Sequence, residues 1–266
     1  TKVIYTAHGF HFFKGAPLLN WLLFYPAEWL LAPVTDVLIT INKEDHARAL
    51  KQLHAKRIEY VPGVGIHTEK FREQNVDRLE KRSSLGYGPD DFLALTVAEM
   101  TPNKNHITIL KALALLKDTE EFKNMHYLIC GRGEMWASLE QSAKELGIAD
   151  HVHFMGYRTD APDFYRCSDL FLFMTYREGL SVALMEAMGS GLPVVCSRIR
   201  GNTDLIEEQG GTLFDPRSVD DCADAIGRML NADYEQMGRF NAQKILGFSR
   251  ETVGRQMADL YRPDPK

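Results

Sequence analysis

The sequence has few cysteines, no surplus of basic residues and no long uninterrupted hydrophobic run. Its four cysteines lie far apart without a C-x-x-C pair, which argues against a disulfide framework and favours buried thiols in a reducing compartment. The formal net charge of −5 argues against a protein that binds the phosphates of nucleic acids through concentrated Lys and Arg. Residues 17–34 form the longest apolar stretch, but Asn20, Pro26 and Glu28 interrupt it. It is also shorter than the roughly 20 residues that cross a bilayer, so we expect no membrane-spanning helix.

The sequence does have the length and composition of a folded globular protein. Its 266 residues are 45% hydrophobic and 25% charged, which is enough for one large or two modest domains. No signal peptide is visible, and this absence together with the cysteine pattern predicts a cytoplasmic location. Because the chain starts at Thr1 and enters a strand-like run directly, we expect that a preceding part of the protein is missing.

Short β-branched runs alternate with amphipathic helical patterns almost throughout the chain. This order is typical of α/β proteins with a parallel sheet. We expect strands at residues 3–6, 37–41, 92–98, 126–130, 151–154, 170–175, 193–197 and 211–214. We expect helices at residues 44–53, 106–116, 136–146, 184–189, 219–230 and, at the end of the chain, 250–261.

The density of expected strands divides the chain unequally. Residues 69–248 contain six of them with intervening helices, which makes a complete doubly wound, Rossmann-like unit. Residues 1–60 contain only two, so we expect them to be part of a second, incomplete Rossmann-like domain. Residues 61–68 are rich in proline and glycine and would cross between the two domains, and residues 249–266 would return toward the first.

One strand-loop-helix stretch carries the clearest chemical signal. A buried strand is expected to end near Thr175, and a helix is expected to start near Ser181, a residue type that caps helices well. Ligands of open α/β sheets bind at this edge, and Gly179 would let a phosphate approach the backbone. Glu178 and Glu186 are eight positions apart, or about 12 Å along a helix, which matches the span of a diphosphate with hydroxyl groups on both sides. Two glutamates alone would more often be the solvated ends of a helix.

The tract E-G-L-S-V-A-L-M-E-A-M-G-S-G-L-P-V-V at 178–195 resembles the signature of glycosyltransferase family 4, whose retaining enzymes have the GT-B fold of two facing Rossmann-like domains. Three other stretches agree with that family in order and spacing. They contain the pair Lys104-Asn105, the turn Gly131-Arg-Gly133 and the loop around Arg158. The run T-A-H-G-F-H near the start is similar to one in enzymes of bacterial capsule and exopolysaccharide assembly.

The resemblance implies a hexosyltransferase that moves a sugar, with retention, from a nucleotide sugar to a hydroxyl acceptor in the synthesis of a cell-surface glycan. UDP is the expected nucleotide, a lipid-linked glycan is a candidate acceptor, and a peripheral contact with the inner membrane face would fit such an acceptor. No metal and no cofactor beyond the nucleotide sugar are expected. The implied catalytic residues are His8, Lys104 and Glu178, and the implied donor-binding residues are Gly131, Gly133, Arg158, Gly179, Leu180 and Glu186.

One position departs from the family pattern, and two other activities stay open. Many family members have an arginine before the lysine, where this sequence has Glu99, so Lys104 would act without that partner. Either Arg132, Arg158 or Arg177 supplies the positive potential instead, or the affinity for the donor is weaker. The chain could be a nucleotide-sugar-binding module without turnover. It could also be a sugar-nucleotide epimerase or a phosphorylase of the same fold.

The aromatic-rich stretch at residues 21–31 has apolar residues on nearly all sides of its expected helix. This pattern predicts a buried or half-covered helix. A surface for a lipid-linked acceptor or for the bilayer interface is the alternative, although the stretch contains none of the Lys and Arg that interfacial helices usually carry.

Overall fold

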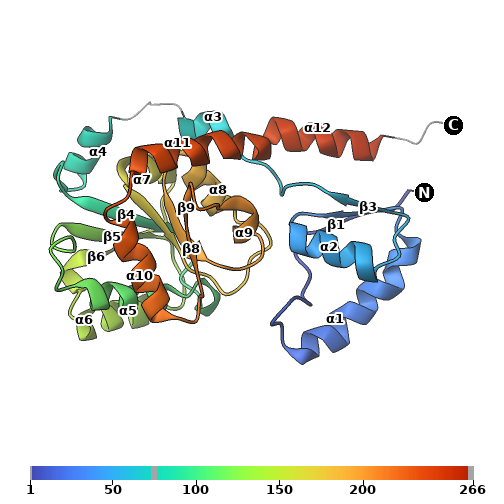
Figure 1. The fold of residues 1–266 in the computed structure, drawn as a ribbon, viewed down its shortest axis with the longest axis horizontal. Coiled ribbons are helices and arrows are strands. Elements are labelled where there is room, and N and C mark those ends of the chain that lie inside the picture. Colours follow the sequence, from blue (N-terminus) through green and yellow to red (C-terminus); the bar gives the residue numbers. More distant parts are fainter. Residues whose placement is uncertain (1, 73–76, 263–266) are drawn as a thin grey trace.

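Two parallel β-sheets, each covered by helices, organise the chain (Figure 1). The structure is a computed structural model and describes residues 2–72 and 77–262. The smaller sheet has the strand order β1-β2-β3, and the larger has the order β6-β5-β4-β7-β8-β9. The strands are β1 (Ile4–Ala7), β2 (Val37–Thr40), β3 (Arg57–Tyr60), β4 (Phe92–Val97), β5 (Met125–Cys130), β6 (Val152–Gly156), β7 (Leu170–Phe173), β8 (Val194–Ser197) and β9 (Gly211–Phe214).

The helices lie between the strands, as a parallel sheet requires. They are α1 (Leu18–Leu31), α2 (Lys43–Gln52), α3 (Thr68–Arg72), α4 (Arg78–Ser84), α5 (His106–Leu116), α6 (Trp136–Glu145), α7 (Ala161–Cys167), α8 (Val182–Gly189), α9 (Asn202–Leu205), α10 (Val219–Met229), α11 (Tyr234–Lys244) and α12 (Arg250–Tyr261). The expected parallel α/β architecture is confirmed.

All eight strands expected from the sequence are present, and their ends differ from the expected ones by no more than two residues. The expectation of only two strands before residue 69 is wrong, because β3 is a third. Its residues Arg57 and Glu59 place charges within a four-residue strand at the edge of the smaller sheet, and the strand is nowhere fully buried. The periodic apolar signal that reveals the other strands is therefore absent here.

Strand order in the larger sheet reverses between β4 and β7. The chain first builds outward from β4 through β5 to β6, and then returns to the other side of β4 with β7, β8 and β9. The helices that follow β4 and β7, which are α5 and α8, therefore lie on opposite faces of the sheet, and the loops that lead into them start from neighbouring strands. Such a switch point is where open α/β sheets bind ligands.

Both faces of the larger sheet are covered. Tyr127 and Ile129 of β5 lie in one apolar cluster with α5, α6 and α10, and Leu128 and Cys130 lie in the other with α7 and α8. This alternation follows from the two-residue period of a strand. All four cysteines of the sequence are free and buried, as expected.

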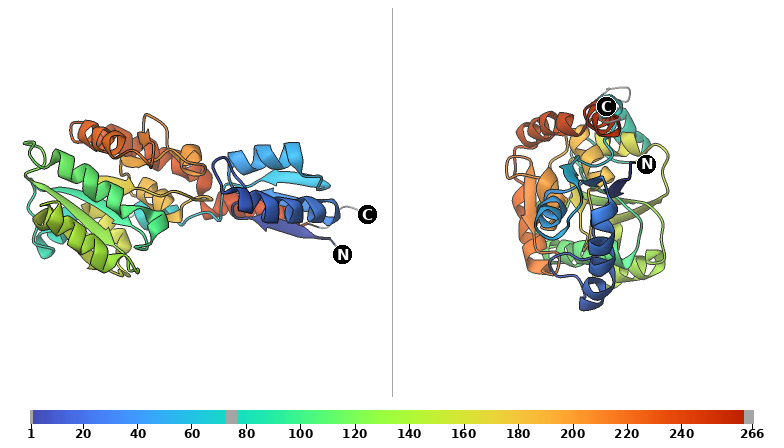
Figure 2. Two further views of the ribbon diagram at one scale, coloured as in Figure 1. Left: turned by 90° about the horizontal axis from the view of Figure 1, so that it is seen from below. Right: turned by 90° about the vertical axis from the view of Figure 1, so that its right-hand side faces the viewer.

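The smaller sheet is covered on one face by α2 and on the other by α12. Leu38 packs in a cluster with Phe12 and with Ala49 of α2, whereas the next residue, Ile39, packs in a cluster with Val253 of α12. Figures 1 and 2 show α12 leaving the larger part of the molecule and running along the smaller one. The last helix thus ties the two parts together.

The segment that links the two sheets runs close beside the start of α12. The Ile66 amide donates a hydrogen bond to the Phe248 carbonyl (3.1 Å), and the Arg250 amide donates one to the Ile66 carbonyl (2.9 Å). Gly65 has a φ of +70°, and a Cβ there would lie 2.8 Å from the Cα of Arg250. Glycine is therefore needed at this position both for its conformation and for the close backbone approach.

Helix α1 is far more exposed than its composition suggests. None of its residues is buried, and only Trp21 and Tyr25 pack against the core of the smaller part. The sequence predicts a buried or half-covered helix; burial is wrong, and the contacts of Trp21 and Tyr25 agree with a helix that is covered on one side. The exposed fractions of Leu18 and Leu22 are 81% and 71%.

Candidate active site

The loops after β4 and β7 meet at the switch point and are bonded to each other. The Tyr176 amide donates to the Asn103 carbonyl (2.9 Å), and the Asn103 side-chain amide donates to the Arg177 carbonyl (3.1 Å). This pairing brings the Lys104 ammonium group within 2.5 Å of the Glu178 carboxylate. Two of the predicted catalytic side chains, 74 positions apart in the sequence, thus form an ion pair that is largely shielded from solvent.

Asn105 has a structural role that the family resemblance did not indicate. It has a φ of +45°, which asparagine tolerates better than most residues, and it starts helix α5. Its buried side chain donates to the Pro216 carbonyl (3.0 Å) and accepts from the Thr108 hydroxyl (2.9 Å). These bonds turn the chain sharply after Lys104, so Asn105 positions that lysine instead of reaching for a ligand itself.

The N-terminal loop after β1 completes the arrangement. His8 is exposed and lines a pocket of about 190 Å³ together with Glu178, Gly179 and Arg200. A Cβ at Gly179 would lie 2.0 Å from the His8 carbonyl oxygen, so only glycine lets the two loops approach this closely. The expected reason for this glycine, the approach of a phosphate, is not needed to explain it.

Helix α8 begins later than the spacing argument assumed. Ser181 is its N-cap, as expected, and its hydroxyl accepts from the Leu184 amide (3.3 Å). Residues from Glu178 to Ser181 are therefore outside the helix, and the rise of an ideal helix does not measure the separation of Glu178 and Glu186. Leu180, next to the cap, packs against Gly63 of the linking segment.

Glu186 lies in α8, half-buried, and accepts a hydrogen bond from the Tyr165 hydroxyl (3.2 Å). Burial raises the pKa of its carboxyl group above the usual value, against the opposing effect of the Tyr165 bond. The Glu186 carboxylate thus has one bonded partner and unused capacity to accept further hydroxyl groups.

The Gly131-Arg-Gly133 turn after β5 packs against the loop after β4, which carries Lys104. A Cβ at Gly131 would lie 1.9 Å from the Ala98 carbonyl oxygen, and one at Gly133 would lie 2.3 Å from that of Met100. Any larger residue would push the two loops apart. Both glycines are thus explained by packing of backbone on backbone.

Arg158 is already engaged within the protein. Its guanidinium donates to the Asp160 carboxylate at 2.8 and 2.7 Å and lies over the ring of Phe164. This bidentate contact is the largest cause that lowers the pKa of Asp160 well below its usual value. The Arg158 side chain is therefore fixed in orientation next to the edge of β6.

Sequence reasoning missed an ion pair that joins the two parts of the molecule. Arg200, in the loop after β8, binds the Asp45 carboxylate of α2 at 2.7 Å and donates to the Glu178 carbonyl at 3.1 Å. Both charged side chains are buried, with exposed fractions of 5% and 0%. Their separation of 155 positions leaves no local pattern, and the only available signal was the location of Arg200 after a strand of the same sheet edge.

Within the described residues, no three His, Cys, Asp or Glu side chains are grouped so that they could hold a metal ion. A helix with the length and hydropathy to span a membrane is likewise not found among residues 2–72 and 77–262.

Comparison with known proteins agrees with this geometry. The family described as glycosyl transferases group 1 matches residues 77–244. EpsD of Bacillus subtilis, which is named as a glycosyltransferase, is 35% identical over 98% of this chain and 69% of its own length. An Escherichia coli enzyme, named UDP-Gal:alpha-D-GlcNAc-diphosphoundecaprenol alpha-1,3-galactosyltransferase, is 26% identical over 97% of this chain and 68% of its own length.

Among solved structures, Anabaena Alr3699/HepE in complex with UDP superposes with a TM-score of 0.84 at 20% identity, covering 97% of this chain and 71% of that one. WaaG, described as a glycosyltransferase involved in lipopolysaccharide biosynthesis, superposes with a TM-score of 0.81 at 21% identity, covering 98% of this chain and 75% of that one. These likenesses establish the expected GT-B fold with its two Rossmann-like sheets. The chain accordingly belongs to the glycosyl transferases group 1 family and is a glycosyltransferase of the hexosyltransferase type.

Proposed function

We propose that this chain transfers a hexosyl group from a UDP-sugar to a hydroxyl acceptor, with retention of the anomeric configuration, in the synthesis of a cell-surface glycan. The observation that carries the proposal is the Lys104–Glu178 ion pair beside the His8 pocket at the switch point. The names of similar proteins support the donor and the acceptor class. One includes UDP-Gal and a diphosphoundecaprenol-linked acceptor, another structure contains UDP, and a third protein acts in lipopolysaccharide biosynthesis.

Lys104 has the charge and the valence to stabilise the departing diphosphate. Its ammonium group has three donors, so it can keep its bond to Glu178 and still donate to a phosphate oxygen. Negative charge grows on the diphosphate as the bond to the anomeric carbon breaks, and a fixed cation there stabilises the transition state more than the ground state. Amide groups of Gly179 and Leu180, just before helix α8, would add to this stabilisation.

The remaining residues bind the other parts of the donor in this proposal. Glu178, oriented by Lys104, accepts from hydroxyl groups of the transferred sugar, and Glu186 accepts from those of the ribose. The Gly131–Gly133 turn and the loop held by Arg158 border the place of the base. Glu99 takes the position of the arginine that many family members have, and it is exposed. Lys104 is therefore the cation that the loop after β4 contributes in this proposal.

Retention follows if the acceptor arrives on the face from which the diphosphate leaves. The acceptor oxygen then bonds to the anomeric carbon as the bond to the diphosphate breaks, and the acceptor proton passes to an oxygen of that diphosphate. His8 lies beside Glu178 in the same pocket and would border the transferred sugar there. The transition state has oxocarbenium character, as in other glycosyl transfers.

The product from an α-linked UDP-sugar is therefore expected to be an α-glycoside, formed at an unchanged rate in the presence of EDTA. Proton NMR of the new linkage reads the configuration, and the rate with and without EDTA reads the need for a divalent ion. A β product would contradict the proposed mechanism. Loss of activity in EDTA would contradict the assignment of charge stabilisation to Lys104 and the start of α8.

We also propose that α1 contacts the membrane surface that carries a lipid-linked acceptor. The helix contains no Lys or Arg, and its one acidic residue, Glu28, accepts a hydrogen bond from the Tyr5 hydroxyl (2.8 Å). Burial raises the pKa of the Glu28 carboxyl group. Exposed apolar side chains gather on the rest of the helix and on the turn that follows it, namely Leu18, Leu19, Leu22, Leu23, Phe24, Trp29, Leu30, Leu31 and Val34.

The protein is expected to co-sediment with vesicles of neutral phosphatidylcholine, and Leu22→Glu is expected to weaken this binding about tenfold or more. Insertion of one leucine into the bilayer contributes about 1.5–3 kcal/mol, and each 1.4 kcal/mol is about a factor of ten. Leu50→Glu on α2, where the side chain is 59% exposed, is the matched control and should bind as the unchanged protein does. No binding to neutral vesicles, or equal binding of both variants, would contradict this contact.

A further inference from the structure

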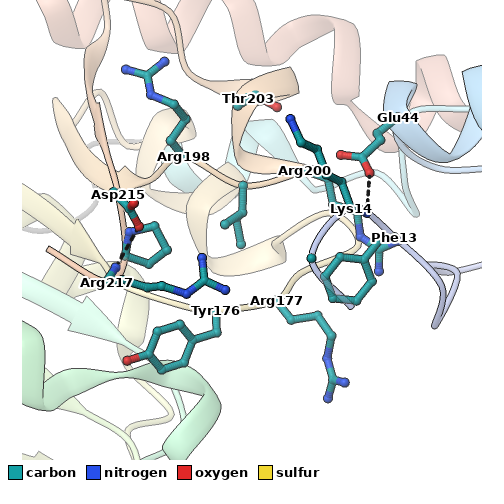
Figure 3. A pocket seen from close by; sticks show the side chains of 13 residues that line it. Phe13, Lys14, Glu44, Tyr176, Arg177, Arg198, Arg200, Thr203, Asp215 and Arg217 are labelled. Atoms are coloured by element: carbon teal, nitrogen blue, oxygen red, sulfur yellow. Dashed lines mark hydrogen bonds between the residues drawn. The ribbon is translucent and has the colours of Figure 1, made fainter. Parts of the chain in front are cut away.

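A basic pocket of about 450 Å³ shares lining residues with the pocket around His8, and its lining does not include Lys104, Glu178 or Glu186 (Figure 3). It opens beside the carboxyl ends of β7, β8 and β9, whereas Lys104 follows β4. Five cationic side chains line it against two anionic ones, in a chain whose net charge is −5. The cations are Lys14, Arg177, Arg198, Arg200 and Arg217, and the anions are Glu44 and Asp215.

Most of these cations form no ion pair with the acidic side chains that the structure describes. Among the described residues, the side chains of Lys14, Arg177 and Arg217 have no acidic partner, and Arg198 donates only to the Leu213 carbonyl (2.8 Å). Arg200 is the exception, because it is paired with Asp45 outside the pocket.

The two carboxylates of the pocket are themselves partly occupied. Glu44 accepts from Arg48 (3.3 Å) and from the Lys14 backbone amide (3.5 Å), and Asp215 accepts from the Arg217 backbone amide (2.9 Å). Figure 3 shows that the cations come from separate segments of the chain. Several cations with spare donors, which different segments bring to one pocket, match the requirements of a phosphate group better than those of a neutral sugar.

The basic pocket adjoins the smaller pocket that contains His8. Arg177 and Arg200 line both, and Arg177 is the immediate neighbour of Glu178 in the chain. The loop that carries Glu178 thus borders the basic pocket through Arg177 and contacts Lys104 through Glu178. A ligand in the basic pocket can therefore extend an uncharged part into the smaller pocket, where the proposed function places the transferred sugar.

We propose that this pocket binds the diphosphate group of the acceptor, so that the preferred acceptor is a sugar diphosphate ester whose hydroxyl group reaches the pocket around His8. This inference rests on the proposed glycosyl transfer and adds to it the chemical class of the acceptor and the residues that select it. Lys14, Arg198 and Arg217 would serve this recognition alone, since none of them lines the smaller pocket. Lys14 and Arg217 are chosen for the test because neither side chain has a hydrogen-bond partner among the described residues.

Binding of inorganic pyrophosphate tests the pocket without any turnover. In calorimetry with the full chain and with UDP held at saturation, pyrophosphate is expected to bind, and Lys14→Gln and Arg217→Gln are each expected to weaken it about tenfold. A hydrogen bond to a charged group contributes about 1.5–3 kcal/mol, which corresponds to roughly that factor. Arg228→Gln, on the outer side of α10, is the matched control and should leave binding unchanged. No binding in the presence of UDP, or equal binding by all three variants, would overturn the proposal.

Acceptor kinetics separate this proposal from the proposed function. A sugar linked through a diphosphate to a short prenyl chain is compared with the same sugar as an alkyl glycoside. In the Lys14→Gln and Arg217→Gln variants, the KM of the diphosphate acceptor should rise about tenfold, while the KM of the alkyl glycoside and of the UDP-sugar should stay unchanged. An equal rise for both acceptors would overturn the diphosphate assignment. A protein that binds pyrophosphate in this pocket but transfers sugar to neither acceptor would contradict the proposed function instead.

Discussion

Lys104→Ala is expected to lower kcat for sugar transfer about 10²-fold, the scale on which loss of one oxyanion-type donor acts. The variant removes the cation that faces the leaving diphosphate. It also leaves the Glu178 carboxylate, 15% exposed, without the ammonium group that orients it. The measurement is kcat and KM with a UDP-sugar under initial-rate conditions, with thermal unfolding to show that the variant is folded.

A second lysine variant tests whether this result is specific to the site. Lys111→Ala, on the exposed side of α5, removes a lysine from the helix that follows Lys104 and should leave kcat unchanged. A kcat of Lys104→Ala close to that of Lys111→Ala would contradict the charge-stabilising role.

Glu186→Ala should raise the donor KM more than it lowers kcat, because ribose contacts are nearly equal in the ground and transition states. The raised pKa of Glu186 also means that the donor KM should increase at acidic pH, as protonation removes an acceptor, and Glu186→Gln should abolish that dependence.

Asp45→Ala is expected to lower the free energy of unfolding by about 3–5 kcal/mol, the cost of breaking a buried ion pair on one side. The Arg200 guanidinium would remain buried without its countercharge. The Phe10 amide and the Asn42 side chain would each lose the carboxylate oxygen that accepts from them at 3.0 and 2.8 Å. Urea unfolding and calorimetry measure the effect, and the transition of the smaller part should shift first, because its contact with the larger part is weakened.

An exposed ion pair in the smaller part of the molecule provides the control for Asp45→Ala. Asp36 binds Lys56 at 2.7 Å and accepts from the Val3 amide at 2.7 Å, but the lysine is 67% exposed, so Asp36→Ala should destabilise the protein much less than Asp45→Ala does. Adding Arg200→Met to Asp45→Ala should restore part of the lost stability, because it removes the unpaired charge. Equal losses for Asp45→Ala and Asp36→Ala would be incompatible with a buried link between the two parts.

Local sequence patterns were sufficient for most of the fold. Strands such as β5 and β7 are short apolar runs between helical patterns, and the helix at His106–Leu116 was located to the residue. The sequence pattern does not predict strand β3, because charged residues at the sheet edge interrupt the apolar period of the strand. For α1 the apolar composition predicts a buried or half-covered helix, but none of its residues is buried, because composition does not reveal which neighbours are present to cover a helix.

The candidate site was predictable only where residue type and strand position coincide. Lys104 and Glu178 each follow a strand of the larger sheet, so their placement at one edge follows from the strand order. His8 follows β1 of the smaller sheet, and only the packing of the two parts brings it beside Glu178. The reasons for the glycines were a different matter. Gly131 and Gly179 were predicted from their motif to approach a ligand, whereas in the structure each makes room for a carbonyl oxygen of another loop.

Periodicity and turn residues act within about one helix or strand, so the sequence alone determines the features that depend on them. These features are the parallel α/β order, the break near residues 61–68 and the Ser181 cap. The Lys104–Glu178 and Asp45–Arg200 pairs do not depend on such local patterns, because their members are 74 and 155 positions apart. The same is true of the basic pocket, whose cations come from loops near residue 14 and from residues 177–217. Charges at such separations carry no mutual signal in the sequence, and their chemistry exists only once backbone packing has brought the loops together.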